Sequence, residues 1–356
     1  MKTSKLDDAL IHQNYGTIAN VVDEDVRWFD RYYMNLQAID GSLSIGQGTG
    51  VYPNMGVMDG FGMISTPDFQ VNVRASRELV NGDRDVMAVG PVHAEIIEPM
   101  KVWRFWLEEN EQGITYDFLF ESSFEAMEAA RLESIVDGRR VCDWTHFAHA
   151  GRARGWAKVD GETIDLRPDS HYVIRDRSWG VRPGTAVIAD MAAWWREANW
   201  GSRHNWLCAQ VDSFYIWYFL TEEDDGTGRH FEGLVRWNEA CGGGQEAIAR
   251  VERQMNFATD DHFLNARVDV HLASGRVLPI NLRRTETCAH LRGGGYGGIN
   301  GLIHGMKQGP FTIVGERWEP SDSRQNSASM GLQDHVVELT WEGERGCGIL
   351  ELGFGT

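Results

Sequence analysis

The sequence predicts an all-β protein, built as a sandwich or a barrel of many short antiparallel strands. Large flat side chains are common, with 14 Trp, 15 Phe and 9 Tyr among 356 residues, and 40 Gly supply tight turns beside only 9 Pro. Runs typical of strands recur at roughly 8–12-residue spacing. Helical periodicity is scarce, and the βαβ alternation of a doubly wound nucleotide-binding fold is missing.

Two hairpins are predicted in the first half of the chain. Residues 101–120 form two aromatic-rich runs around residues 109–113, and residues 155–166 form a second pair around Asp160 and Gly161. Gly-containing turns and the Asp-Gly dipeptide are typical connections between antiparallel strands. We therefore expect both segments to pair with themselves.

Three further strand pairs are predicted in the second half. They are the aromatic run 205–220, followed by an acidic turn, the run 266–273 before the turn Ser274-Gly275, and the runs 336–341 and 347–352. Each is bounded by Gly, Ser, Asp or Glu residues that favour turns. Together with the first half, they make strands the main element along the whole chain.

Four segments depart from this strand pattern. Residues 187–198 predict one short helix, and residues 244–256 fit either a helix or a strand. The Gly-rich stretches 46–50 and 292–298 lack the spacing of a dinucleotide or phosphate loop. We interpret both stretches as turns or as places where the backbone approaches another segment closely.

Charge and composition exclude several classes of function. The chain carries 34 Lys and Arg against 52 Asp and Glu, a formal charge of −18, which repels nucleic acid and anionic membrane surfaces. The sequence has no run of about 18 apolar residues, so we expect no stable membrane insertion. The first residues, MKTSKLDDALIHQ, lack the apolar core of a secretory signal. We expect a cytoplasmic protein.

Metal and cofactor motifs are not recognised in the sequence. The five Cys are odd in number and form no CxxC pair, so neither a disulfide framework nor a zinc knuckle is predicted. His146 and His149 have a spacing that suits a metal on a helix, but the segment favours a strand and no third ligand is evident. We expect no metal and no cofactor.

The densest group of chemically active side chains lies in residues 175–183, which hold three Arg, one Asp and one Trp. On a strand, alternation places Arg175, Arg177 and Trp179 on one face and Asp176 on the other. An Asp among arginines is expected to stay ionised and firmly placed. The run is either a functional site or an ion-pair cluster that closes the end of a barrel.

The run R-D-R-S-W-G-V-R resembles the D-H-x-W-G signature of the carotenoid 1,2-hydratase and AttH-like superfamily. The segments 27–35, 50–60 and 346–351 extend the resemblance to nearly the whole chain, which looks like a bacterial branch of that superfamily. The resemblance implies two tandem lipocalin-like antiparallel β-barrel or β-sandwich domains with few short helices. We predict these domains at residues 1–190 and 191–356.

The resemblance also suggests a chemistry. Relatives include hydratases of acyclic carotenoids and, more distantly, cyclases of the Diels-Alderase type. In the hydratase branch, the histidine and tryptophan of the signature and an aspartate on a following strand are associated with protonating an alkene. Here Trp179 matches, whereas Arg177 stands at the histidine position and removes a group that titrates near neutral pH. Asp212 is the best positional candidate for the aspartate.

Asp212 is either an acid inside a barrel, where desolvation would raise its pKa and make it a proton donor near pH 7, or a carboxylate on a surface strand or turn. The predicted catalytic residues are Asp176, Asp212, Trp179 and Arg177. The predicted substrate-binding residues are Arg182, Trp206, Phe214, Trp217, Tyr52, His304 and Tyr296.

The predicted function is that of a cofactor-independent lyase or isomerase acting on a hydrophobic terpenoid, steroid or polyene. Asp176 or Asp212 would move the proton in a hydration, dehydration, isomerisation or cyclisation of an alkene. Trp179 would shield the cationic centre, and Arg177 or Arg182 would orient an oxygen. The alternative is a carrier that binds a hydrophobic small molecule without reaction. A homodimer is compatible with either function.

Overall fold

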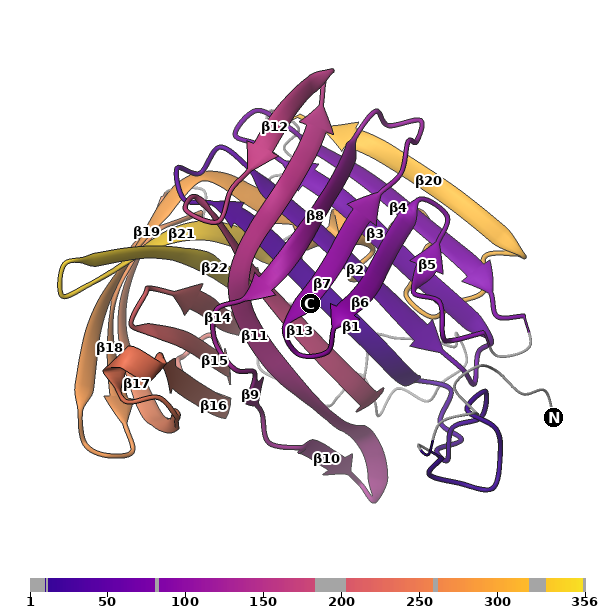
Figure 1. The fold of residues 1–356 in the computed structure, drawn as a ribbon. Helices are drawn as coiled ribbons and strands as arrows, with labels where there is room; N and C mark the ends of the chain where they lie inside the picture. Colours follow the sequence, from indigo (N-terminus) through magenta and orange to yellow (C-terminus); the bar gives the residue numbers. More distant parts are fainter. Residues whose placement is uncertain are drawn as a thin grey trace.

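The structure, a computed structural model, describes residues 10, 12–80, 83–182, 203–258, 262–319 and 331–354. Within these residues strands dominate, and the helical elements are two short 3-10 turns, η3 (Glu239–Cys241) and η4 (Leu291–Gly294). The strands form two bodies, a large curled sheet and a closed barrel (Figure 1). The predicted all-β, two-body class is therefore confirmed.

The curled sheet has fourteen strands, with the main path β20-β4-β3-β2-β1-β13-β11-β8-β7-β6-β5, and β9, β10 and β12 attached to β11. Its strands are β1 (Trp28–Ala38), β2 (Ser44–Tyr52), β3 (Val57–Ser65), β4 (Gln70–Glu78), β5 (Ala88–Val89), β6 (Val92–Glu98), β7 (Val102–Leu107), β8 (Thr115–Ser122), β9 (Met127–Glu128), β10 (Leu132–Val136), β11 (Arg139–Val159), β12 (Glu162–Leu166), β13 (His171–Val181) and β20 (Phe311–Trp318).

The barrel closes in the order β14-β15-β16-β17-β18-β19-β21-β22. Its strands are β14 (Arg203–Gln210), β15 (Phe214–Glu222), β16 (Gly228–Trp237), β17 (Gln245–Phe257), β18 (Phe263–Leu272), β19 (Val277–His290), β21 (Gln333–Trp341) and β22 (Glu344–Phe354). Closure leaves every strand of the barrel paired on both sides, which removes the exposed edges of an open sheet.

All five predicted hairpins are confirmed, as the pairs β7–β8, β11–β12, β14–β15, β18–β19 and β21–β22. Residues 244–256 form strand β17 and not a helix, since they pair with β16 and β18 along the barrel wall. Tertiary pairing overrides the local helical preference of this segment. The helix expected over residues 187–198 lies outside the described residues.

Each body has its own apolar core. The curled sheet wraps around a cluster that includes Trp103 and Phe105, and the barrel is filled by side chains such as Phe214 and Leu339. A third cluster joins the two bodies, with Phe61 from the sheet and Trp217 from the outer barrel wall. We call the region of this third cluster the junction. Strand alternation sends every second residue of β1 and β13 into it.

Strand β20 belongs to the curled sheet although it comes from the second half of the sequence. It pairs with β4 over its whole length, and Figure 1 shows its orange arrow beside the purple strands. The segment between β19 and β20, residues 291–310, therefore passes from the barrel to the sheet; we call it the crossing loop. The predicted division between residues 190 and 191 falls outside the described residues and stays a prediction. No helix among the described residues is long and apolar enough to cross a bilayer.

Candidate functional site

Glycines let the crossing loop lie directly on the curled sheet. A Cβ atom at Gly293 would come within 2.1 Å of the Asn72 side chain, and one at Gly294 within 2.9 Å of the Phe61 ring. The close backbone approach predicted for residues 292–298 is thus confirmed. Residues 46–50 lie in β2, where the glycines again leave room for neighbouring side chains such as Phe61. The loop brings Tyr296 and His304 over the sheet.

Arg31 lies at the centre of the side chains gathered under the crossing loop. It is buried, its Nη2 atom lies 3.2 Å from Nε2 of His304, and its guanidinium carbon lies 4.5 Å from the ring centroid of Tyr296. Its Nε and Nη1 atoms have no hydrogen-bond partner among the described residues. Burial lowers the pKa of Arg31, but Tyr296, Tyr52 and Asp59 raise it above its usual value. Arg31 therefore stays charged.

His304 joins Arg31 to a carboxylate. Its Nδ1 atom lies 3.3 Å from Oδ1 of Asp59, and the other carboxylate oxygen accepts a hydrogen bond of 2.7 Å from the backbone N–H of Gly305. Burial, helped by the charge of Arg31, lowers the pKa of His304 to about 4, against the opposing effect of Asp59. The imidazole is thus neutral at neutral pH, with Nδ1 donating to Asp59 and Nε2 accepting from Arg31.

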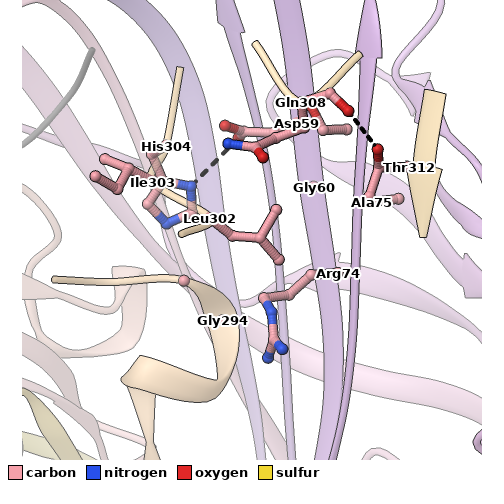
Figure 2. Close-up of a pocket in the computed structure, with 12 residues that line it drawn as sticks. Asp59, Gly60, Arg74, Ala75, Gly294, Leu302, Ile303, His304, Gln308 and Thr312 are labelled. Atoms are coloured by element: carbon pink, nitrogen blue, oxygen red, sulfur yellow. Dashed lines mark hydrogen bonds and ion pairs between the residues drawn. The ribbon is translucent and has the colours of Figure 1, made fainter. Parts of the chain in front are cut away.

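A small pocket opens beside His304. Figure 2 shows its lining, in which Asp59 and Arg74 come from the sheet and Leu302, His304 and Thr312 from the crossing loop and β20. Its free space is about 30 Å³, room for about one or two water molecules. The pocket can hold water or a small polar group, and a polycyclic molecule does not fit in it.

Tyr52 and Arg182 complete the charged and polar side of the site. Tyr52 is fully buried, and its hydroxyl has no hydrogen-bond partner within the described chain. Burial, with the nearby charge of Asp59, raises its pKa, so the hydroxyl is a neutral donor. Arg182 lies 4.9 Å above the ring of Phe29. Burial and the charge of Arg31 lower the pKa of Arg182.

Asp176 faces the same region from β13, opposite Tyr33 of β1. Its side chain is half-buried, and its Oδ1 atom is shielded from solvent without a hydrogen-bond partner in the described residues. Burial raises its pKa to about 7, although Arg182, Arg31 and the other arginine nearby lower it. The expectation that arginines keep Asp176 ionised is therefore wrong, because desolvation outweighs them. The carboxyl is poised to hold or release a proton near neutral pH.

The outer wall of the barrel supplies the aromatic side of the junction. Trp217 is fully buried, its ring lies 4.9 Å from that of His146, and its Nε1 atom has no hydrogen-bond partner among the described residues. Trp206 is the cross-strand neighbour of Glu351. The structure thus brings together Asp176, Arg182, Tyr52, His304 and Tyr296, and adds Trp206 and Trp217 from the barrel.

Arg177 and Trp179 lie on the opposite face of β13 from Asp176. Arg177 forms an ion pair with Asp30, and Trp179 is 39% exposed with its ring 6.4 Å from that of Phe147. The alternation predicted for this strand is confirmed. The expected joint action of Asp176, Arg177 and Trp179 at one centre is wrong, because the sheet separates them.

Asp212 and Phe214 are also placed away from the junction. Asp212 lies in the turn between β14 and β15, its side chain is 87% exposed, and it pairs with Arg152 at 3.1 Å. The alternative of a turn carboxylate is therefore confirmed, and the placement of Asp212 inside the barrel is wrong. Phe214 points into the barrel core, 5.2 Å from the ring of Trp341.

Sequence reasoning gave no role to several residues of the site. Arg31, Asp59 and Glu351 lie in segments that carry the family resemblance. That resemblance is the sequence signal that could have pointed to them. Asp334 and Glu351 are brought together by the pairing of β21 with β22. The described residues contain no group of three His, Cys, Asp or Glu side chains that could hold a metal.

Comparisons with known proteins give the following likenesses. Kievitone hydratase from Nectria haematococca is similar with a TM-score of 0.47 and 11% identity, over 92% of this chain and 89% of that chain. A putative AttH from Nitrosomonas europaea is similar with a TM-score of 0.48 and 14% identity, over 92% and 93%. CghA with Sch210972 is similar with a TM-score of 0.46 and 11% identity, over 93% and 89%.

A search of curated proteins finds no match to this sequence. One family model, described as "Family of unknown function (DUF8625)", matches residues 3–355. Because that match covers nearly the entire sequence, the chain belongs to the DUF8625 family.

Proposed function

We propose that the protein is an enzyme that transfers a proton to or from a small hydrophobic molecule at the junction, with Asp176 as the acid–base group. The observation that carries the proposal is the state of Asp176. Its side chain is half-buried, one oxygen has no partner among the described residues, and burial raises its pKa to about 7. A carrier has no need of such a carboxyl, since burying it without a partner costs free energy. An acid–base enzyme does need it.

The neighbouring side chains suit the binding of an apolar molecule with one oxygen. Two buried nitrogen atoms of Arg31, Nε and Nη1, have no partner in the described chain, and the hydroxyl of Tyr52 is likewise unpartnered. Charged and neutral donors of this kind stabilise a carbonyl or a developing negative charge on oxygen. Trp206 and Trp217, both buried, make the barrel side of the junction apolar, which suits the apolar part of the molecule.

The reaction that we favour is the addition of water to a double bond of a terpenoid, steroid or polyene, or the loss of water from the corresponding alcohol. In hydration, Asp176 gives its proton to one alkene carbon, water adds to the other carbon, and the surplus proton of that water returns to Asp176. Dehydration is the reverse sequence. Isomerisation or cyclisation would begin with the same proton transfer, and none of these steps requires a cofactor.

The test uses an apolar extract of cells as a mixture of candidate substrates, analysed by mass spectrometry before and after incubation. We expect the native protein to convert at least one compound, with a change of one water or with an isomeric product. Asp176→Asn should lower the rate by about 100-fold or more, since general acid–base catalysis contributes on that scale. Asp212→Asn is the matched control, because this carboxylate is exposed. Binding without conversion in all three proteins would indicate a carrier.

A further inference from the structure

Two buried carboxyl groups face each other beside Asp176. Asp334 and Glu351 are cross-strand neighbours on β21 and β22, and both are buried. The hydroxyl of Tyr33 and the amide of Asn35 both donate to Oδ2 of Asp334, the amide at 2.9 Å. Oδ1 of Asp334 is buried and has no hydrogen-bond partner among the described residues, and the cross-strand position of Glu351 places the second carboxyl group next to Asp334. A hydrogen bond between two carboxyl groups requires a proton on one of them.

The surroundings of Asp334 favour its protonated form. Burial raises its pKa well above the usual value, and the charge of Glu351 raises it further. The hydrogen bonds from Tyr33 and Asn35 lower it by less. Two adjacent carboxylates in an apolar setting cannot both be ionised without a large cost, so the pair carries one proton at neutral pH.

Glu351 connects this pair to the surface on one side and to Asp176 on the other. His204 of β14 lies with its Nε2 atom 2.5 Å from Oε1 of Glu351, and its side chain is 27% exposed. On the inner side, Tyr33, which donates to Asp334, lies opposite Asp176 across β1 and β13. The charge of Glu351 also raises the pKa of Asp176 and of Tyr296. The charges of Arg182, Arg31 and, from the opposite face of β13, Arg177 lower the pKa of Asp176.

We propose that Asp334 and Glu351 hold one proton between them and form, with His204, the route by which Asp176 exchanges its proton with solvent. His204 takes a proton from water and passes it to Glu351. The pair then gives one proton to the Asp176 carboxylate and returns to its original state, so a single proton enters and leaves. These three residues act through Asp176 and are positioning residues. The proton route rests on the proposed function. The shared proton of Asp334 and Glu351 does not depend on that function.

Infrared spectroscopy tests the shared proton without any substrate. At pH 8, where Asp176 is mostly ionised, we expect a carbonyl band of a buried carboxylic acid that shifts in heavy water. The band should persist in Asp176→Asn and vanish in Asp334→Asn. Glu351→Gln should change its frequency, which keeps the test informative if Asp334→Asn folds poorly. Glu338→Gln is the matched control, since Glu338 lies on the same strand and pairs with Arg345. Absence of the band in the native protein would overturn the shared proton.

A pH jump from 6 to 8, followed by infrared absorption of the Asp176 carboxyl, tests the route. We expect His204→Gln to slow the loss of the proton at least tenfold with unchanged amplitude, and added imidazole to restore the rate. His271→Gln is the control, because His271 forms a similar surface contact with Glu252. An unchanged rate in His204→Gln would overturn the route. Failure of the proposed function would look different, with normal proton exchange but unchanged conversion in Asp176→Asn.

Discussion

Both faces of strand β13 carry charged side chains, but these side chains have different roles on each face. On the face toward the core of the curled sheet, Arg175 lies 4.4 Å from the ring centroid of Trp103 and bonds to His149 at 3.1 Å, and Arg177 pairs with Asp30. On the junction face, Asp176 has an oxygen without a partner in the described residues. The ion pair of Arg177 and the ring contacts of Arg175 stabilise the fold, although Nε and Nη1 of Arg175 also lack a hydrogen-bond partner among the described residues. A half-buried and incompletely partnered carboxyl is costly and chemically useful. Neighbours in sequence thus differ in role because alternation sends them into different surroundings.

The largest predicted change in the free energy of unfolding comes from the substitution of Arg175. Its guanidinium is surrounded by the rings of Trp103, Phe120 and Phe147, and burial lowers its pKa to about 9. Arg175→Ala removes these contacts and leaves a cavity, so we expect a loss of about 3 kcal/mol in the free energy of unfolding. Urea denaturation measures it.

Arg177→Ala is the control for Arg175. The Arg177 side chain is partly exposed, and its ion pair with Asp30 should contribute about 1 kcal/mol or less. Equal losses in the two variants would mean that the aromatic surroundings of Arg175 contribute nothing beyond a surface ion pair.

A smaller change in the free energy of unfolding, this time a gain in stability, is predicted for the substitution of Asp176. Its pKa is raised to about 7 in the folded protein from a usual value of 3.8, so the folded state binds more protons than the unfolded state between these values. Stability is therefore lost as the pH rises from about 4 to 7. Asp176→Asn should remove this loss and stabilise the protein by roughly 2 kcal/mol at pH 8, with little effect near pH 4, allowing for the partial exposure of the side chain.

Denaturation of both proteins across this pH range gives the measurement. A native protein whose stability rises from pH 4 to pH 7 relative to Asp176→Asn would show that Asp176 is an ordinary paired carboxylate. The acid–base role would then lose its main support.

Local sequence predicted the strands and their faces but could not tell which aspartate is buried. Hairpins and alternation depend on neighbours along the chain, and both were predicted correctly around β13. Asp176 and Asp212 looked equally suitable because burial at the junction depends on how the barrel packs on the sheet. That packing brings Arg31, His304 and Glu351 together from widely separated positions, and no spacing in the sequence encodes it. Strand β17 was ambiguous for the same reason, since its pairing partners decide its conformation.

The smallest effect is predicted for Trp179, which tests whether the sheet truly separates the two faces. Its ring is 39% exposed and contacts Phe147 on the far side from Asp176. Trp179→Ala should cost less than about 1 kcal/mol of stability, since a partly exposed ring buries little area. The pH at which the Asp176 carboxyl titrates, followed by infrared absorption, should stay unchanged. A clear shift of that titration would show that the two faces communicate through the backbone of β13, and the assignment of Trp179 to a structural role would have to be abandoned.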